Sequence, residues 1–220
     1  MVWSKGEVRA AYDRIADSYA AARTQSWPEV VDFITSLPAG GLVVDLGCGH
    51  GRHSRPLALT GHRVIGIDVS RRLLSIGKKA ASSSPEFKQI NWLGADTTAL
   101  PFPDATFDAA LCIAVLHHLA SRRDRIVALS EMGRVLRPNG EAFVSVWSAD
   151  DPHIENLLGG RPKKPDVEIP WRLPDGGAVL RPYHLFQEGE LERLVIESGL
   201  HGERYFRVAG NWFALVKANG

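Results

Sequence analysis

Three glycines at every second position mark the stretch of this sequence whose residue types best suit ligand binding. Residues 42–51 read Leu-Val-Val-Asp-Leu-Gly-Cys-Gly-His-Gly, an apolar run that contains one acid and passes into the glycines. An apolar run without polar alternation is typical of a parallel strand covered on both faces. Glycine suits a sharp turn or a close approach to a ligand because it has no Cβ. A strand, a glycine turn and a helix in this order predict backbone N–H groups that face a bound cofactor.

The spacing of the glycines separates two kinds of cofactor. The dinucleotide fingerprint Gly-x-Gly-x-x-Gly would need a glycine where this chain has Arg52. Asp68 ends the apolar run 64–67, about 20 residues past the glycines, where a carboxylate can bind both hydroxyls of a ribose. Both features have a structural alternative. Asp68 is also suited to cap the helix predicted after it. The glycines alone are also compatible with a tight turn in any α/β protein.

Polar residues also stand at the ends of two later apolar runs. Asp96 follows the run 87–93, and the pair His117 and His118 follows the run 109–115. In an open parallel sheet, ligands bind outside the carboxyl ends of the strands, so we expect these residues to converge with the glycines. Either histidine has the alternative role of satisfying a buried backbone carbonyl.

Composition and charge limit the classes of protein that fit. The chain has 220 residues, of which 45% are hydrophobic, enough for one full core. Its 26 basic and 25 acidic residues give a net charge of +1, which argues against a stand-alone nucleic-acid binder unless local patches or a partner contribute. Cys48 and Cys112 are the only cysteines and lack metal or disulfide spacing, so no metal site is predicted. Without a membrane-length apolar run or a secretory leader, we expect a soluble cytoplasmic protein.

The elements that must position these residues follow from periodicity and from helix and turn signals. Residues 6–37 are predicted to form two helices around a break at 26–28, and Tyr12 and Tyr19 there either pack in the core or belong to a lid over the cofactor. Residues 148–177 are rich in Pro, Gly and charge, which predicts an irregular, substrate-facing loop within an insertion at about 148–185. Further helices are predicted over 52–60, 71–81, 122–136 and 188–198, a strand over 142–147, and a terminal hairpin over 205–208 and 212–216.

Taken in order, these features resemble the class I S-adenosylmethionine-dependent methyltransferases, and Asp45 with the three glycines matches motif I of that class. The resemblance implies an α/β fold, a Rossmann-like, seven-stranded, mostly parallel sheet with helices on both faces, in a single domain over residues 1–220. It implies S-adenosylmethionine as the cofactor, with Asp96 accepting from the adenine amino group. The residues expected to bind the cofactor are Tyr19, Asp45, Gly47, Gly49, Asp68, Asp96 and Ala114.

A narrower resemblance reaches beyond the predicted cofactor site. Residues 113–125, Ile-Ala-Val-Leu-His-His-Leu-Ala-Ser-Arg-Arg-Asp-Arg, are similar to a segment of the wobble-uridine tRNA carboxymethyl-methyltransferases, although that family tends to a denser Arg/Glu cluster at 123–125. Those enzymes esterify 5-carboxymethyluridine, or its 2-thio form, at the first anticodon position. The resemblance implies the tRNA anticodon loop as a partner, and a small zinc-binding activator subunit shared by translation-related methyltransferases. The other matching segments are 12–16 with Arg23, Trp27 and Pro28, then 146–147, 181–186, 189–191 and 211–213.

The chemistry of such a reaction places few demands on the protein. A carboxylate acceptor is already ionised near pH 7, so methyl transfer needs positioning and desolvation rather than a general base. Arginine suits the positioning because its planar fork pairs bidentately with a carboxylate. Arg23 and Arg181 are the candidate clamps, with His117, His118 and Tyr183 as secondary donors. The tryptophans that either stack a splayed base or pack in the core are Trp27, Trp147 and Trp212.

Two other functions remain compatible with the sequence. A small-molecule methyltransferase of the quinone-biosynthesis or general type would share the stretch 100–108 and the turn 136–140, and the near-neutral charge favours it. The segments 183–186 and 211–213 favour the tRNA enzyme. A degenerate methyltransferase that serves as a binding scaffold is opposed by the intact glycines and acids. Phosphate-binding candidates, each otherwise a solvated surface, are Arg122, Arg123 and Arg125, then Arg161, Lys163 and Lys164, then Arg71, Arg72, Lys78 and Lys79.

Overall fold

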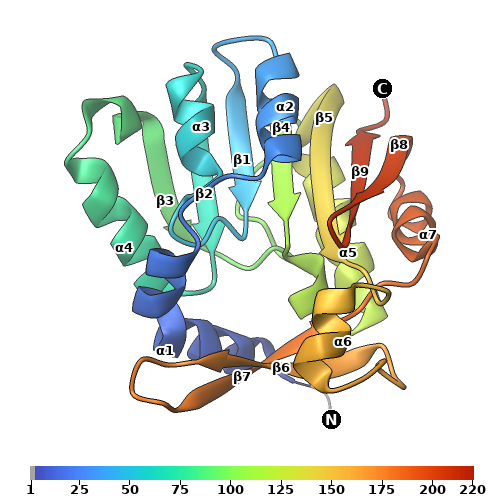
Figure 1. Ribbon diagram of the computed structural model, residues 1–220. Coiled ribbons are helices and arrows are strands. Elements are labelled where there is room, and N and C mark those ends of the chain that lie inside the picture. Colours follow the sequence, from blue (N-terminus) through green and yellow to red (C-terminus); the bar gives the residue numbers. More distant parts are fainter. Residues whose placement is uncertain (1–2) are drawn as a thin grey trace.

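The chain forms a seven-stranded, mostly parallel sheet (Figure 1). The computed structural model describes residues 3–220. The strands of this sheet are β1 (Leu42–Leu46), β2 (Arg63–Asp68), β3 (Ile90–Gly94), β4 (Phe107–Ile113), β5 (Leu136–Trp147), β8 (His201–Val208) and β9 (Asn211–Lys217). Their order is β3-β2-β1-β4-β5-β9-β8, with β1 to β5 parallel and β9 antiparallel to both its neighbours. The predicted α/β fold class is confirmed, including the antiparallel last strand.

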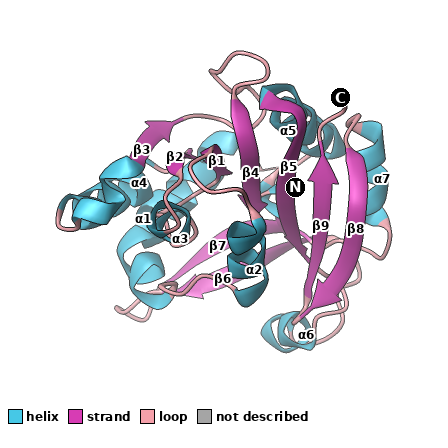
Figure 2. Ribbon diagram, turned by 90° about the horizontal axis from the view of Figure 1, so that it is seen from above, coloured by secondary structure: helices cyan, strands magenta, loops and turns pink. Residues whose placement is uncertain are grey.

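Helices cover both faces of the sheet, with a hydrophobic core on each side (Figure 2). The α-helices are α1 (Lys5–Ala22), α2 (Pro28–Ser36), α3 (Ser54–Leu59), α4 (Arg71–Ser82), α5 (Arg122–Val135), α6 (Pro152–Leu158) and α7 (Glu190–Glu197), and the short 3-10 turns are η1 (Pro85–Gln89) and η2 (Leu116–His118). Leu129 of α5 and Leu194 of α7 join one core, whereas Phe33 of α2 and Leu57 of α3 join the other. Within residues 3–220, no helix is both long and apolar enough to cross a membrane.

Local sequence signals fix where the helices nearest the site begin. Ser4 accepts from the backbone N–H of Glu7, and the Glu7 carboxylate accepts in return from the Ser4 backbone, a capping box that begins α1. Ser70 accepts from the backbone N–H of Leu73 and begins α4 directly after β2. Pro28 is the first residue of α2, a position where its missing N–H leaves no hydrogen bond unmade. The predicted break at 26–28 is thus confirmed.

Several strand boundaries differ from those predicted, and the first strand of the terminal hairpin begins at His201 rather than at residue 205. The third strand begins at Ile90, because Pro85 opens a 3-10 turn over the residues before it. The fourth ends at Ile113, because Ala114 has a φ of 60° and turns the chain into η2. The Pro-Asn-Gly turn at 138–140 does not separate a helix from the fifth strand; β5 already pairs with β4 at Leu136, and the turn forms a bulge within it.

The prediction of an irregular loop over 148–177 is wrong. This segment contains α6 and a strand, β6 (Asp166–Arg172), which pairs antiparallel with β7 (Ala178–His184). Pro170 and Pro182 lie within these strands and obscure the alternation of apolar and polar residues that identifies a strand in sequence. Proline is tolerated here because both strands of a two-stranded ribbon are edge strands, where a missing N–H need not break a hydrogen bond of the sheet. The β6–β7 hairpin and α1 lie together across the carboxyl ends of the main strands (Figure 1). They close the side of the sheet where the candidate site lies.

Candidate active site

Two adjoining cavities lie at the carboxyl ends of β1, β2 and β4; residues of α1 line both of them, and residues of β7 line only the outer one. The inner cavity is lined by Gly47, Gly49, His50, Asp68 and Asp96, among others. The outer cavity is lined by Arg23, His117, Trp147, Arg181 and Tyr183, among others. The residues that line both cavities, which we call the neck, are Tyr12, Tyr19, Arg52, Ala114 and His118. The predicted site residues are therefore brought together, except Asp45, which lines neither cavity.

The turn after β1 has a backbone that favours glycine. Gly47, Gly49 and Gly51 have φ values of 68°, 57° and 84°, in the left-handed region that side chains with a Cβ rarely adopt. A Cβ on Gly47 would lie 2.4 Å from Val115, and one on Gly51 would lie 2.3 Å from Trp92. The turn therefore presents bare backbone to the inner cavity.

Gly47→Ala should destabilise the fold and weaken ligand binding in the inner cavity. The positive φ costs about 1–2 kcal/mol, and the clash with Val115 adds roughly 1–3 kcal/mol. Gly40→Ala is the matched control, because Gly40 also has a positive φ, 83°, but a Cβ there meets nothing within 4 Å. Equal losses of unfolding free energy in denaturant titrations of the two variants would show that the clash is relieved without cost.

Asp68 presents a carboxylate to the inner cavity from the end of β2. Its Oδ2 accepts from the backbone N–H of Gly49 at 2.8 Å, and its Oδ1 accepts from that of Ser70 at 2.7 Å. Burial raises the pKa of Asp68 to about 6, so the carboxylate is mostly ionised at pH 7. A carboxylate offers about four acceptor positions, so two remain for ligand hydroxyls.

Asp45 supports the glycine turn from beneath. Its side chain is buried, and its Oδ2 accepts from the hydroxyl of Ser54, the first residue of α3, at 2.6 Å. Burial raises the pKa of Asp45 to about 7, and the nearby carboxylate of Asp68 adds to this. The structure therefore places Asp45 where it ties β1 to α3 rather than in the wall of either cavity.

Asp96 lies in the wall of the inner cavity but is already engaged. Its Oδ1 accepts from the backbone N–H and the hydroxyl of Thr98, each at 2.9 Å, and its Oδ2 pairs with Lys5 Nζ at 2.8 Å. Burial raises the pKa of Asp96, but the hydrogen bonds from Lys5 and Thr98 outweigh it and leave the pKa below its usual range. The sequence did not indicate Lys5, which α1 brings to this side of the cavity.

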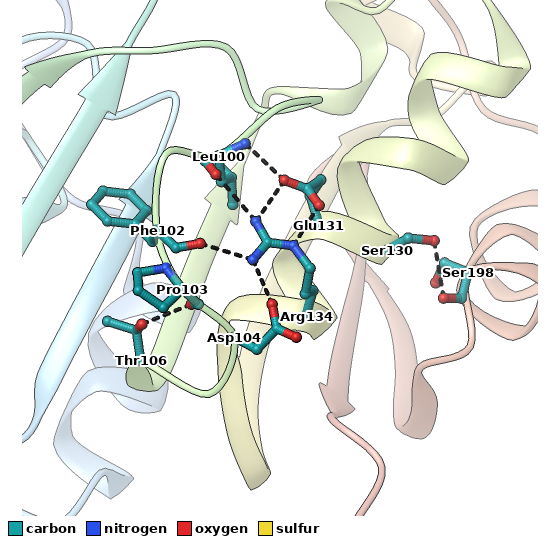
Figure 3. A network of polar contacts seen from close by, with 9 residues as sticks. All are labelled: Leu100, Phe102, Pro103, Asp104, Thr106, Ser130, Glu131, Arg134 and Ser198. Atoms are coloured by element: carbon teal, nitrogen blue, oxygen red, sulfur yellow. Dashed lines mark hydrogen bonds and ion pairs between the residues drawn. The ribbon is translucent and has the colours of Figure 1, made fainter.

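The loop after Asp96 is fixed to α5 by a polar network (Figure 3). Glu131 accepts from the backbone N–H of Leu100 at 2.8 Å. Arg134 donates to the carbonyls of Leu100 and Phe102 and pairs with Asp104 and Glu131. The hydrogen bonds to Glu131 and Asp104 raise the pKa of Arg134. This network fixes the loop that carries one wall of the inner cavity.

The two histidines after β4 are neutral, and their ring protons can be assigned. Nδ1 of His117 accepts from the backbone N–H of Trp147 at 3.2 Å, so its proton lies on Nε2. Nδ1 of His118 lies 2.9 Å from the carbonyl of Pro182, which only accepts, so its Nε2 accepts from the Tyr12 hydroxyl at 2.7 Å. Burial lowers the pKa of His117 and lowers that of His118 to about 3. His118 is thus committed to neighbours, whereas His117 retains a ring N–H.

Arg181 and Tyr183 project from one face of β7 into the outer cavity. Arg181 is only 4% exposed, and its Nη1 donates to the Tyr183 hydroxyl at 2.7 Å. Its guanidinium carbon lies 5.0 Å from the centre of the Trp171 ring. Burial lowers the pKa of Arg181, but Tyr183 and Tyr12 raise it more, so the group stays charged. Because the Tyr183 oxygen accepts from Arg181, its own proton remains available for a ligand.

Beyond these strand residues, the hairpin is anchored next to the outer cavity. His184 Nδ1 lies 2.7 Å from Asp166 Oδ1 on β6, and its Nε2 lies 2.7 Å from Glu190 Oε1 on α7. The Tyr183 ring stacks on Trp147 with ring centres 4.5 Å apart. These contacts hold β7 against the end of β5 and so position the residues that β7 presents.

Sequence reasoning missed two nitrogen-bearing side chains in and beside the glycine turn, those of Arg52 and His50. Arg52 follows the third glycine directly, and it was read only as the absence of a dinucleotide glycine. His50 lies within the motif itself; it is 3% exposed, and neither ring nitrogen has a hydrogen-bond partner among residues 3–220. Burial lowers the pKa of His50 to about 4, and Arg55 and Arg52 lower it further. Their positions in the sequence could have identified them, because His50 lies within the predicted ligand-binding turn and Arg52 directly follows it.

Each of the three predicted phosphate-binding clusters contains one arginine that is paired with an acidic residue. Arg72 pairs with Asp17 at 2.5 Å, Arg161 pairs with Asp150 at 2.5 Å, and Arg122 pairs with Glu197. The pairs are exposed or partly exposed, so each contributes little to the stability of the fold and can exchange for a phosphate. Of the tryptophans, Trp27 and Trp147 line the outer cavity, and Trp212 does not.

Comparison with known sequences places the chain beside tRNA-modifying enzymes. A family model described as "Methyltransferase domain" matches residues 44–144. The chain is 30% identical to the tRNA (carboxymethyluridine(34)-5-O)-methyltransferase of Schizosaccharomyces pombe, over 96% of both chains. It is 28% identical to the enzyme of that name from Xenopus tropicalis, over 96% of this chain but only 40% of that protein. The chain thus spans less than half the length of some curated relatives.

Solved structures share the fold. A Haloferax volcanii methyltransferase, in complex with the activator Trm112, superposes with a TM-score of 0.74 and 18% identity, over 97% of this chain and 98% of that one. The 1,6-didemethyltoxoflavin-N1-methyltransferase of Burkholderia thailandensis, with S-adenosylhomocysteine bound, superposes with a TM-score of 0.71 and 20% identity, over 100% of this chain and 92% of that one. At these identities the likeness shows a class I methyltransferase fold and leaves the substrate open.

Proposed function

The chain belongs to the tRNA (carboxymethyluridine(34)-5-O)-methyltransferase family of class I S-adenosylmethionine-dependent methyltransferases, and on that premise we propose that it esterifies the carboxylate of 5-carboxymethyluridine, or its 2-thio form, at the wobble position of tRNA. The observation that carries the proposal is the pair of cavities joined at the neck. One cavity offers carboxylates and bare backbone, which suits the cofactor, and the other offers three arginines, which suit an anionic acceptor. A single neck between them is where a methyl group would pass.

The inner cavity fits S-adenosylmethionine. Asp68 has acceptor positions left for the two ribose hydroxyls, and Gly47 and Gly49 line the cavity with backbone that a ligand can approach. Asp96 and Lys5 lie where the adenine would be recognised, and Tyr19 and Ala114 line the neck. When bound, S-adenosylmethionine would supply an electrophilic methyl group, which a carboxylate oxygen can attack in line with the carbon–sulfur bond while the sulfur leaves. Residues 6–37 would then act as a lid, since α1 contributes Tyr12 and Tyr19 to both cavities.

Affinity for S-adenosylhomocysteine should fall as the pH drops below about 6. The ribose hydroxyls need an ionised Asp68, whose pKa in the ligand-free protein is raised by burial to about 6. Binding favours the ionised form, so the dissociation constant should rise by up to about tenfold per pH unit below this pKa and level off above pH 7. Calorimetric titrations from pH 5 to 8 measure this, and the Asp68→Asn variant should lose the dependence. A slope that persists in that variant would assign the titration to another group.

The outer cavity supplies what a carboxylate acceptor needs. Arg23 lies at the exposed rim, and Arg181 lies in the wall with Tyr183 beside it. Trp27 and Trp147 offer rings on which a splayed base can stack. His117 retains an N–H donor, and no general base is needed. The β6–β7 hairpin, within the insertion at 148–185, would shape this cavity for its acceptor.

We propose two macromolecular partners. The tRNA anticodon loop would supply the acceptor, with its phosphates displacing the carboxylates that now pair with the surface arginines. An activator subunit comparable to the one in the Haloferax volcanii complex would support cofactor binding. We propose that this subunit is small and binds zinc, as the resemblance of the sequence implies. The net charge of the chain is only +1, so its overall field attracts RNA weakly. The partner would therefore add to the affinity for RNA.

One observation favours a small-molecule acceptor instead. One arginine of each basic cluster is paired with an acidic neighbour, which lowers the positive charge that these surfaces offer to a phosphate. The test is transfer of labelled methyl from S-adenosylmethionine to bulk tRNA carrying unesterified carboxymethyluridine, with and without an activator subunit. Label in RNA supports the tRNA assignment. Cofactor binding without any label in RNA, with the activator present, would favour the small-molecule acceptor.

A further inference from the structure

The neck contains one side chain that carries charge at pH 7, and that side chain is Arg52. Its companions Tyr12, Tyr19 and Ala114 are uncharged, and burial lowers the pKa of His118 to about 3. Donor methyl and acceptor oxygen must meet where the two cavities join, since a displacement requires reacting atoms about 3–3.5 Å apart. A cation at this point therefore lies next to both reacting groups.

Of the three arginines of the outer cavity, Arg52 is partly buried at the neck and Arg23 is exposed, and neither side chain forms a hydrogen bond or an ion pair in the described part of the chain. Arg181 donates to Tyr183 and lies against Trp171, whereas Arg23 is exposed at the rim. Arg52 forms no hydrogen bond or ion pair with any residue in the range 3–220, although Glu29 also lines the outer cavity. Its guanidinium carbon lies 4.9 Å from the centre of the Trp27 ring, which fixes the plane of the group without using its N–H donors.

From this arrangement we infer that Arg52 binds the acceptor carboxylate at the neck and aims one of its oxygens at the methyl group. The inference rests on the proposed function and names the residue that performs its central step. A guanidinium that donates to both carboxylate oxygens leaves further lone pairs on each, so the attacking oxygen stays nucleophilic. That oxygen forms the new bond to carbon, the carbon–sulfur bond breaks with its electron pair going to sulfur, and no proton is transferred.

A second anion could compete for Arg52, namely the α-carboxylate of the amino-acid part of the cofactor. Arg52 lines the inner cavity beside His50, whose ring nitrogens lack partners, so this role has to be tested separately. The two roles differ in what they predict. An acceptor clamp acts on tRNA kinetics and on discrimination between acceptors, whereas a cofactor clamp acts on the affinity for S-adenosylhomocysteine.

The test compares Arg52→Gln with wild type, using tRNA with carboxymethyluridine as substrate and tRNA with carbamoylmethyluridine as competitor. We expect kcat/KM to fall about 10- to 100-fold in the variant, and affinity for S-adenosylhomocysteine to change by less than about threefold. Wild type should bind the carboxylate tRNA about tenfold more tightly than the neutral amide tRNA, and the variant should lose this preference. Arg63→Gln, an exposed arginine at the opposite end of β2, is the matched control and should behave as wild type.

The outcomes separate the inference from the proposed function. Loss of cofactor affinity with retained preference for the carboxylate would overturn the acceptor role and assign Arg52 to the cofactor. Unchanged kcat/KM in Arg52→Gln would also overturn it. Failure of wild type itself to esterify the tRNA, in the presence of an activator, would refute the proposed function instead. Arg52→Lys adds a check on folding, because it keeps the charge and should retain more activity than the glutamine variant.

Discussion

Replacing Asp68 by alanine is expected to lower the affinity for S-adenosylhomocysteine by about 100-fold or more, since each of two hydrogen bonds to a carboxylate contributes roughly 1.5–3 kcal/mol. Asp68 also accepts from the backbone N–H groups of Gly49 and Ser70, so its removal loosens the turn that faces the cofactor. Both effects act in the same direction. Isothermal titration calorimetry measures the change directly.

Two further variants show which effect dominates. Asp68→Asn keeps the shape of the side chain and one acceptor oxygen, so most of its loss would reflect the missing charge. Asp32→Ala, which removes an exposed acid on α2 away from both cavities, should leave affinity unchanged. If Asp68→Ala binds S-adenosylhomocysteine as tightly as wild type, the assignment of the inner cavity to the cofactor is wrong.

Replacing Arg181 by alanine should slow methyl transfer about 100-fold while leaving cofactor affinity within about threefold of wild type. The change removes a buried cation from the outer cavity and takes away the donor that holds the Tyr183 hydroxyl. It also leaves a space beside Trp171. Because Arg181 lines the outer cavity and not the inner one, the loss should fall on the acceptor side.

Single-turnover experiments with saturating cofactor measure the rate of methyl transfer, and calorimetry measures the cofactor affinity separately. Arg172→Ala is the matched control, since Arg172 is exposed on the same hairpin. Arg181→Lys keeps the charge and should recover part of the rate. Parallel losses of rate and of cofactor affinity in Arg181→Ala would contradict an acceptor-side role and point to a general disturbance of the hairpin.

The sequence predicted the inner cavity well because its residues follow strands directly. Once β1, β2 and β4 are recognised as parallel neighbours, the topology alone brings their carboxyl ends to one edge, together with the residues that follow them. The fold class followed from the same order of elements. Asp45 shows the limit of this reasoning, since the acid of a motif was expected to face the ligand and instead supports the turn from beneath.

The outer cavity was less predictable because contacts between distant segments build it. The β6–β7 hairpin was expected as a loop, since the prolines in its strands mask the alternation. Lys5 reaches Asp96 across more than ninety positions of sequence, and Tyr12 reaches His118 across more than a hundred. No local pattern reports such contacts. Arg52 differs from these residues, because the sequence shows that it directly follows the glycine turn. The sequence does not show that its side chain lines both cavities.

The central claim is that this chain forms a methyl ester on the wobble uridine. The most direct measurement is digestion of the labelled tRNA to nucleosides after reaction with S-adenosylmethionine and an activator subunit. We expect label in one modified uridine, at the first anticodon position, and its release as methanol by mild alkali. Label that resists alkali, or that appears in another nucleoside, would contradict carboxylate esterification at that position.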